Sequence, residues 1–218
     1  MNRPIRSYVL RQGRTTPAQK RALEELLPKY GIAFSETKIS SSRALVLEIG
    51  SGMGETTVEI ARAHPEVDFV AVEVHGPGVG SLLNSIEKEK IANLRIIRHD
   101  ALDVLEHMIA DGSLAAIHLF FPDPWPKKRH HKRRLVQPEF AALAARKLRG
   151  GGILHAATDW PDYAEQIDAI FSGNDLFEKS GSGFAERPVT KFESRGRRLG
   201  HPVRDLIFRR RGTRPEAR

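Results

Sequence analysis

A carboxylate held between two prolines follows an apolar run in the middle of the chain. The run 115–121 leads into Pro122-Asp123-Pro124-Trp125-Pro126, and every residue from 127 to 134 is Lys, Arg or His. Proline fixes φ and excludes the helix interior, so the pattern predicts a rigid, extended loop that holds Asp123 and Trp125. A carboxylate and a flat ring beside a cationic strip suit an aromatic base attached to a phosphate backbone. The alternative interpretation is a proline-rich turn followed by a solvated run of charges.

A glycine-rich segment predicts a binding loop for a nucleoside cofactor. Glu48-Ile49-Gly50-Ser51-Gly52-Met53-Gly54 follows an apolar run and precedes a helical pattern. The dinucleotide fingerprint needs a third glycine where this chain has Glu55. An acid at a helix start also disfavours a pyrophosphate, which helix N-termini otherwise attract. A cofactor without phosphates fits better, and S-adenosyl-L-methionine is such a cofactor.

Acids at the ends of three successive expected strands support this interpretation. Glu48 can face the positively charged methionine end of the cofactor. Glu73, after the second strand, is placed to accept hydrogen bonds from both ribose hydroxyls. Asp100, after the third strand, can meet the adenine amino group. The glycine loop alone is a common feature, so the three acids give the prediction its specificity.

The order of the expected elements predicts an α/β fold with a doubly wound, mostly parallel sheet in three αβα layers. Apolar strands are expected over residues 44–49, 69–74, 94–97, 115–121 and 153–157. Helices are expected between them, over residues 56–63, 79–91, 102–109, 160–171 and from Pro138 to the glycines at 150–152. Two more strands are expected around 176–184 and 203–208. Strands buried on both faces and alternating with helices form such Rossmann-like sheets, which bind ligands at the carboxyl ends of the strands.

The two ends of the chain are expected to differ from this central pattern. Residues 1–14 are basic and lack periodicity, which predicts a flexible arm before a single domain over 15–218. A helix capped by Thr16 is expected over 18–27 and should stop before Pro28. From 187 to 218 there are eleven Lys or Arg against three acids, which makes a basic C-terminal segment with net charge +8.

The composition restricts the class of protein. The 218 residues fit one domain, with a net charge of +8 and no Cys. The absence of Cys excludes disulfides and thiolate metal sites and is consistent with a cytoplasmic location. Apolar runs are too short to span a bilayer, and no amphipathic helix predicts membrane binding. The concentrated positive charge predicts a nucleic-acid partner. The histidines are scattered without metal-ligand spacing, so we expect no metal site.

Five motifs occur in a fixed order along the chain: Leu47–Gly50, Glu73–Gly80, Phe121–Lys127, Arg134–Phe140 and Thr190–Glu193. They closely resemble those of the bacterial tRNA (guanine-N7-)-methyltransferase family. The resemblance extends from Arg6 to Leu206, essentially the whole chain. The proline motif at 121–127 and Thr190-Lys191-Phe192-Glu193 are the most specific parts. Ser51 departs from the family, which often has an aromatic residue there.

The resemblance implies a class I methyltransferase that uses S-adenosyl-L-methionine to methylate N7 of a guanosine in the tRNA variable loop, at position 46. It assigns cofactor contacts to Glu48, Glu73, Asp100 and Asp123, beside the loop glycines Gly50, Gly52 and Gly54. It assigns the active-site role to Asp123. It assigns substrate contacts to Lys127, Asp159, Thr190, Lys191, Phe192 and Glu193. It assigns RNA contacts to Arg129, His130, His131, Lys132, Arg133 and Arg134.

The chemistry of guanine indicates what such an enzyme needs. N7 carries an in-plane lone pair, so its attack on a sulfonium methyl requires alignment but no prior deprotonation. We expect Asp123 to hold the N1–H and amino edge of the base; a turn-capping Asp is the alternative. Trp125 either stacks on the base or is a buried turn aromatic. Asp159 either contacts substrate or caps the following helix.

Three other functions fit parts of the pattern. A methyltransferase for another RNA would share every cofactor residue. A non-catalytic RNA-binding protein would have no need of Glu48, Glu73, Asp100 and Asp123. A nicotinamide dehydrogenase is disfavoured by the spacing of the glycine loop. The sequence does not distinguish a monomer from a homodimer.

Overall fold

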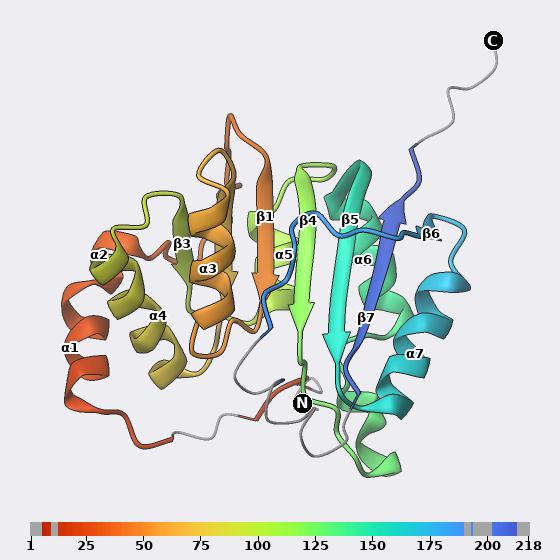
Figure 1. Ribbon diagram of the computed structural model, residues 1–218, viewed down its shortest axis with the longest axis horizontal. Coiled ribbons are helices and arrows are strands. Elements are labelled where there is room, and N and C mark those ends of the chain that lie inside the picture. The colour runs from red at the N-terminus through yellow and green to blue at the C-terminus, as the bar shows by residue number, and fades with distance from the viewer. Residues whose placement is uncertain (1–5, 10–12, 190–192, 194–201, 213–218) are drawn as a thin grey trace.

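A computed structural model describes residues 6–9, 13–189, 193 and 202–212. Its described part contains a sheet of seven strands in the order β3-β2-β1-β4-β5-β7-β6 (Figure 1). The strands are β1 Leu45–Ile49, β2 Asp68–Val72, β3 Leu94–Ile97, β4 Leu114–Phe120, β5 Leu148–Thr158, β6 Phe177–Lys179 and β7 Arg204–Arg210. Strands β1 to β5 pair in parallel, and β7 runs antiparallel between β5 and β6. The predicted mostly parallel α/β sheet is therefore confirmed.

Helices cover both faces of the sheet. They are α1 Pro17–Glu25, α2 Leu27–Tyr30, α3 Glu55–Ala63, α4 Gly76–Glu89, α5 Ala101–Met108, α6 Pro138–Lys147 and α7 Pro161–Ser172. The buried residues form two clusters, one under α5, α6 and α7 and one under α1, α3 and α4. Figure 1 shows α3 and α4 in front of β1 to β3, with α5 and α6 behind the sheet. The apolar stripes of the helices meet the two apolar faces of the strands, as three αβα layers require.

Two boundaries differ from the sequence prediction because of proline and glycine chemistry. The expected helix 18–27 ends at Glu25, and the short helix α2 then includes Pro28 in its first turn. A proline in that position lacks only an N–H that would have no helical partner. Strand β5 begins at Leu148 and continues through the glycines at 150–152, where its register against β4 shifts. Gly151 has φ 77°, so the triplet forms an irregular stretch of strand where we expected the end of a helix.

The C-terminal part of the chain completes the sheet. Strand β6 is only three residues long, shorter than the expected strand at 176–184. Residues 180–189 then form an irregular segment that crosses in front of β5 and β4 in Figure 1. The chain returns to the sheet as β7, next to β5.

Candidate active site and nucleic-acid interface

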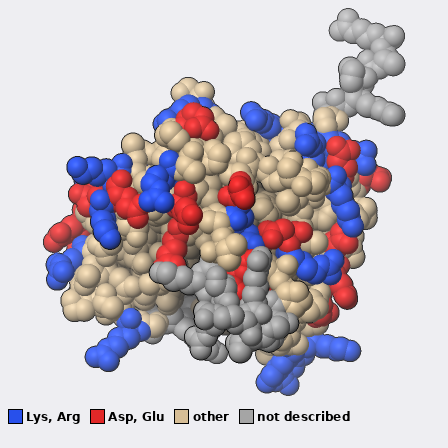
Figure 2. All heavy atoms as spheres, in the orientation of Figure 1, with Lys and Arg blue, Asp and Glu red and all other residues tan. Residues whose placement is uncertain are grey.

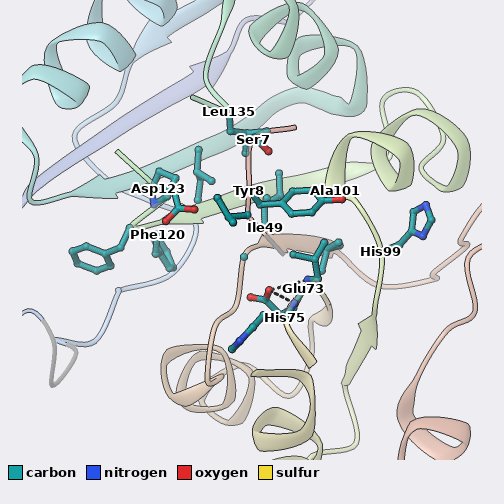
Figure 3. Close-up of a pocket in the computed structure, with 17 residues that line it drawn as sticks. Ser7, Tyr8, Ile49, Glu73, His75, His99, Ala101, Phe120, Asp123 and Leu135 are labelled. Atoms are coloured by element: carbon teal, nitrogen blue, oxygen red, sulfur yellow. Dashed lines mark hydrogen bonds between the residues drawn. The ribbon is translucent and has the colours of Figure 1, made fainter. Parts of the chain in front are cut away.

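A cavity of about 320 Å³ lies where the strand order reverses between β1 and β4. Ligands of doubly wound sheets bind at this position, outside the carboxyl ends of the strands. Main-chain turns after β1, β2 and β4 supply Gly50, Glu73 and Asp123 to its lining. Figure 3 shows the carboxylates of Glu73 and Asp123 on different sides of this one cavity. The fold therefore brings these two acids, which follow different strands, to one cavity.

The glycine loop after β1 is held in a conformation that leaves main chain exposed to ligand. Gly50, Gly52 and Gly54 have φ of 75°, 56° and 83°, in the left-handed region that favours glycine. A Cβ atom at Gly50 or Gly52 would meet no atom within 4 Å. The loop therefore has open space beside its backbone, as close approach of a cofactor requires.

The Glu73 carboxylate organises this loop. It accepts hydrogen bonds from the main-chain N–H groups of Gly52, Val74 and His75, each at 2.8 Å. The residue is 8% exposed. A carboxylate offers about four acceptor positions, so one remains after these three bonds. Glu73 can thus hold the loop and still meet one hydroxyl of a ligand.

Glu48 lies deeper than expected. It is a residue of β1, 4% exposed, and it does not line the cavity in the described part of the chain. Burial raises the pKa of its carboxyl to about 7, partly opposed by the hydroxyl of Thr57, and the nearby Glu73 adds to the rise. Burial therefore disfavours the charged form of Glu48, which sits behind the site instead of facing into it.

Asp100 has a structural role at the third strand end. It is the N-cap of α5, and its side chain accepts a hydrogen bond from the Leu102 N–H at 2.9 Å. The next residue, Ala101, lines the cavity. Burial and the Asp100 carboxylate together raise the pKa of Tyr8, which places Asp100 close to the phenol.

The loop after β4 is more sharply turned than the prolines predict. Phe121 and Trp125 have φ of 53° and 46°, a region that bulky side chains rarely adopt, so the expectation of a wholly extended loop is wrong. Each such residue costs about 1–3 kcal/mol and persists only where its surroundings hold it. The Phe121 N–H donates to the Ala157 carbonyl at 2.7 Å, and Arg134 Nε donates to the Pro124 carbonyl at 2.8 Å. Asp123 is thereby presented at the cavity with an exposed carboxylate.

Residues of the expected N-terminal arm form part of the cavity wall. Ser7, Tyr8 and Val9 line it, although no periodicity in the sequence marked them. The Trp125 indole N–H donates to the Ser7 carbonyl at 3.0 Å. Arg133 lies 4.9 Å over the Trp125 ring. Trp125 therefore connects the cavity wall to the cationic strip.

The cationic strip forms a short 3-10 helix, Lys128–Arg133, with Lys127 as its N-cap. Its lysines and Arg129 are exposed, as phosphate contacts require. Arg134 is the exception, with a side chain only 1% exposed that donates to Pro124, to Gln166 at 2.7 Å and to Asp162 at 2.5 Å. Its guanidinium has no surface to offer RNA and instead anchors the loop.

The residues expected at the substrate are only partly described. Thr190, Lys191 and Phe192 lie outside the described residues. Glu193 is described and is 1% exposed, with its carboxylate accepting from Arg187. Asp159 follows β5, but Trp160 is the N-cap of α7, and α7 has no side-chain cap hydrogen bond. The alternative of Asp159 as a helix cap is therefore wrong.

The remaining predictions concern membranes and metals. Within the described ranges, no helix has the length and apolar character needed to cross a membrane. The same part of the chain contains no cluster of three or more His, Asp or Glu that could hold a metal ion.

Comparisons with known proteins give the context of this site. A family model described as a putative methyltransferase matches residues 42–206. The tRNA (guanine-N(7)-)-methyltransferase of Nitrosomonas europaea is 55% identical over 217 residues, covering 95% of this chain and 97% of the relative. That of Neisseria meningitidis serogroup A is 52% identical over 220 residues, covering 96% and 92%.

Solved structures with low sequence identity share the fold. An rRNA methylase from Streptococcus thermophilus matches with a TM-score of 0.53 at 13% identity, covering 78% of this chain and 89% of the other. A 16S rRNA (adenine(1408)-N(1))-methyltransferase from Catenulisporales acidiphilia, solved with its cosubstrate SAM, matches with a TM-score of 0.53 at 15% identity, covering 94% and 97%. These neighbours support a Rossmann-like methyltransferase fold.

Proposed function

Because the chain belongs to the tRNA (guanine-N(7)-)-methyltransferase family, we propose that it transfers a methyl group from S-adenosyl-L-methionine to N7 of a guanosine in the tRNA variable loop, at position 46. The observation that carries the proposal is the single cavity that Glu73 and Asp123 share. One acid belongs to the cofactor side of the site and the other to the base side.

The residues on the cofactor side fit a nucleoside. Gly50 and Gly52 leave open space beside the backbone, and Glu73 keeps one acceptor position for a ribose hydroxyl. Ile49, Val72 and Ala101 supply apolar lining for a purine ring. When bound, S-adenosyl-L-methionine supplies the electrophilic methyl group. Glu48 acts through its charge from behind the cavity. Asp100 acts by capping the start of α5.

The residues on the base side orient the guanine. N7 needs no general base, so the requirement is a fixed angle of approach. Asp123 is placed to accept from the N1–H and amino groups of the base and to stabilise positive charge that develops on the ring. Lys127 stands at the start of the strip, and we expect its ammonium group to contact a phosphate near the target base. Asp159, Thr190, Lys191 and Phe192 complete the proposed substrate contacts, while the buried carboxylate of Glu193 accepts from Arg187.

RNA contacts come from Arg129 and Lys132, which are exposed, and from His130, His131 and Arg133, which are partly exposed. Phosphate contacts supply most of the affinity for nucleic acid, and a variable loop offers an unstacked guanine. Arg133 lies over the Trp125 ring, and the indole N–H donates to the Ser7 carbonyl. These contacts favour Trp125 as a wall of the base pocket over Trp125 as a free stacking platform.

The test is methylation of tRNA with labelled S-adenosyl-L-methionine, followed by digestion and nucleoside analysis. We expect 7-methylguanosine in wild-type tRNA and none in a tRNA with adenosine at position 46. An rRNA fragment serves as the competing substrate. Label in the rRNA, or in the position-46 variant, would contradict the assignment. The Asp123→Asn variant should retain S-adenosylhomocysteine binding and lose methylation by about 100-fold, the scale expected of a misplaced reactant.

A further inference from the structure

A chain of charged and polar side chains, of which Arg187, Glu193 and His155 are buried and Asp205 is partly exposed, links the irregular C-terminal segment to the sheet. Arg187 Nε and Nη2 donate to the two carboxylate oxygens of Asp205 on β7, at 2.8 and 2.9 Å. Its Nη1 donates to Glu193 Oε2 at 2.5 Å. His155 Nε2 on β5 lies 2.8 Å from Asp205 Oδ1. We call Arg187, Asp205, Glu193 and His155 the arginine clamp.

The clamp lies where the sheet has no helical cover within the described residues. On the face that α1, α3 and α4 cover elsewhere, the segment 180–189 crosses β5 and β4 (Figure 1). In Figure 2, acidic and basic side chains meet in the middle of this face. The Arg187 guanidinium lies 5.7 Å from the Phe120 ring and 5.4 Å from the Phe121 ring. One side chain thus touches the end of β4, the start of the Asp123 loop, and Glu193.

Burial of these charges is unfavourable unless each is paired. The Arg187 side chain is 5% exposed and that of Glu193 is fully buried, whereas that of Asp205 is 37% exposed. Burial opposes the charge on Asp205, but the hydrogen bonds from His155 and Arg187 outweigh it and keep the pKa of Asp205 well below its usual range. A buried ionic network contributes little net stability compared with apolar packing, yet a bidentate Arg–carboxylate pair fixes geometry. The clamp is therefore better suited to setting a position than to holding the fold together.

We propose that Arg187 and Asp205 are positioning residues, which hold Glu193 and the Asp123 loop in the register that methyl transfer requires. Glu193 acts in this arrangement as the anchor of the segment. The inference rests on the proposed function, because the reaction is what the register serves. It adds two residues, Arg187 and Asp205, that do not line the shared cavity.

The test uses Asp205→Asn and Glu193→Gln, which keep size and remove charge. We expect kcat to fall by about 100-fold, the effect of a displacement near 1 Å, while the dissociation constant of S-adenosylhomocysteine changes less than about 3-fold. The double variant should lose little more than either single variant, because members of one network are not additive. Matched controls are Asp168→Asn, whose partner is Lys179 at 2.9 Å, and Glu178→Gln, which faces Arg211. Both controls should retain wild-type kcat.

Other outcomes would overturn the proposal. A wild-type kcat in Asp205→Asn, or equal losses of kcat and S-adenosylhomocysteine affinity, would show that the clamp does not position the base side. If Asp205→Asn melts far below wild type, Arg187→Lys is the second variant, because it keeps the positive charge and removes the bidentate guanidinium contact. It should show an intermediate loss of kcat at near-normal melting temperature. A normal kcat in that variant overturns the proposal.

A readout without turnover separates this proposal from the proposed function. Amide hydrogen exchange over 118–126 should accelerate in Asp205→Asn and remain unchanged over the glycine loop, 48–56. If wild type makes no 7-methylguanosine but the exchange pattern holds, the clamp stands and the reaction is wrong. If wild type methylates and the exchange of the two regions does not differ, the clamp is wrong.

Discussion

The two sides of the shared cavity are built from different groups. The cofactor side is made of main chain, because Glu73 accepts three backbone N–H groups and the glycines leave the backbone open. The base side is held by long side chains, with Arg134 under the Asp123 loop and Arg187 beside it. Backbone hydrogen bonds depend on local chain geometry, whereas the contacts of Arg134 and Arg187 join residues far apart in the sequence.

This difference predicts how each side fails. A side made of main chain tolerates little added volume, because its atoms cannot rotate away. A side held by arginines tolerates changes of shape but depends on charge and on fork geometry. Substitutions of volume should therefore damage cofactor binding first. Substitutions of charge should damage the placement or stability of the loop first.

The largest effect is expected from a methyl group at the contact between α4 and the glycine loop. A Cβ atom at Gly78 would overlap the carbonyl oxygen of Gly52. Overpacking of this kind costs about 1–3 kcal/mol of stability. Because the loop must shift, Gly78→Ala should weaken S-adenosylhomocysteine binding on the order of 100-fold, measured by calorimetry.

The matched control is Gly181→Ala in the segment on the base side. A Cβ atom there would meet nothing within 4 Å. We expect S-adenosylhomocysteine affinity and melting temperature to stay at wild-type values in Gly181→Ala. Normal cofactor binding in Gly78→Ala would show that the backbone of this side is more adaptable than its contacts indicate.

The next effect concerns Arg134, which the sequence places at the end of the RNA-contacting strip. Arg134→Met keeps the aliphatic stem and removes three hydrogen bonds, to Pro124, Gln166 and Asp162. Hydrogen bonds to a charged group are worth about 1.5–3 kcal/mol each, and Asp162 remains hydrated, so a total loss of about 2–3 kcal/mol of unfolding free energy is expected. Chemical denaturation gives the value.

Arg129→Met is the comparison for Arg134→Met within the same strip. Arg129 is exposed, so its loss should leave stability unchanged and lower tRNA affinity, with a salt slope reduced by about one. If Arg134→Met is as stable as wild type and loses tRNA affinity in the same way, the buried anchor role is incorrect.

The same difference explains which parts of the molecule the sequence predicts. Strand β3 was predicted with its observed bounds, and β1, β2 and β4 within two residues, because apolar runs report burial directly. Glu73 lines the cavity, as its position after a predicted strand indicated, although three backbone N–H groups leave it one acceptor position where we expected contacts to two ribose hydroxyls. The base side was harder to predict. Nothing in the spacing of Arg134 separates it from the exposed residues before it, and only tertiary structure shows that Tyr163 and Asp162 enclose it.

Residues missed by the sequence share a physical reason. Tyr8 enters the cavity from a segment without periodicity, and Arg187 meets Asp205 from 18 residues away. Such contacts leave no local pattern. Glu48 was expected to face the ligand because its motif lies beside the glycine loop. The alternation of side chains along β1 turns it into the interior, where burial raises the pKa to about 7.

A smaller effect is expected from pH, and its sign differs between two buried side chains. Glu48 on β1 and His118 on β4 are partners in the register of these two neighbouring strands. Burial raises the pKa of Glu48 from 4.5 to about 7, so its contribution to stability is complete below pH 4.5 and is lost as pH rises through 7. Burial lowers the pKa of His118 from 6.5 to about 3, so its contribution is complete above pH 6.5 and declines as pH falls below it.

Glu48→Gln and His118→Leu should separate these two contributions. Between pH 5 and 8, Glu48→Gln should remove a decrease in stability with rising pH on the order of 2 kcal/mol. His118→Leu should remove an increase of similar size between pH 5 and 6.5. Denaturation at four pH values, without ligand, gives both slopes. Parallel slopes in wild type and both variants would show that neither group changes its ionisation on folding.

The smallest effect tests the contact between Trp125 and the N-terminal wall of the cavity. Trp125→Phe keeps a ring for Arg133 and removes the indole N–H that donates to the Ser7 carbonyl at 3.0 Å. A neutral hydrogen bond is worth about 1 kcal/mol net, so S-adenosylhomocysteine affinity should fall about 5-fold, because Ser7 and Tyr8 line its cavity. Trp160→Phe, at the N-cap of α7, is the matched control and should bind normally. If Trp125→Phe lowers tRNA affinity and leaves the cofactor affinity unchanged, the ring serves the base alone and the two sides are independent. A fall in both affinities would show that the strip and the cavity wall move as one unit.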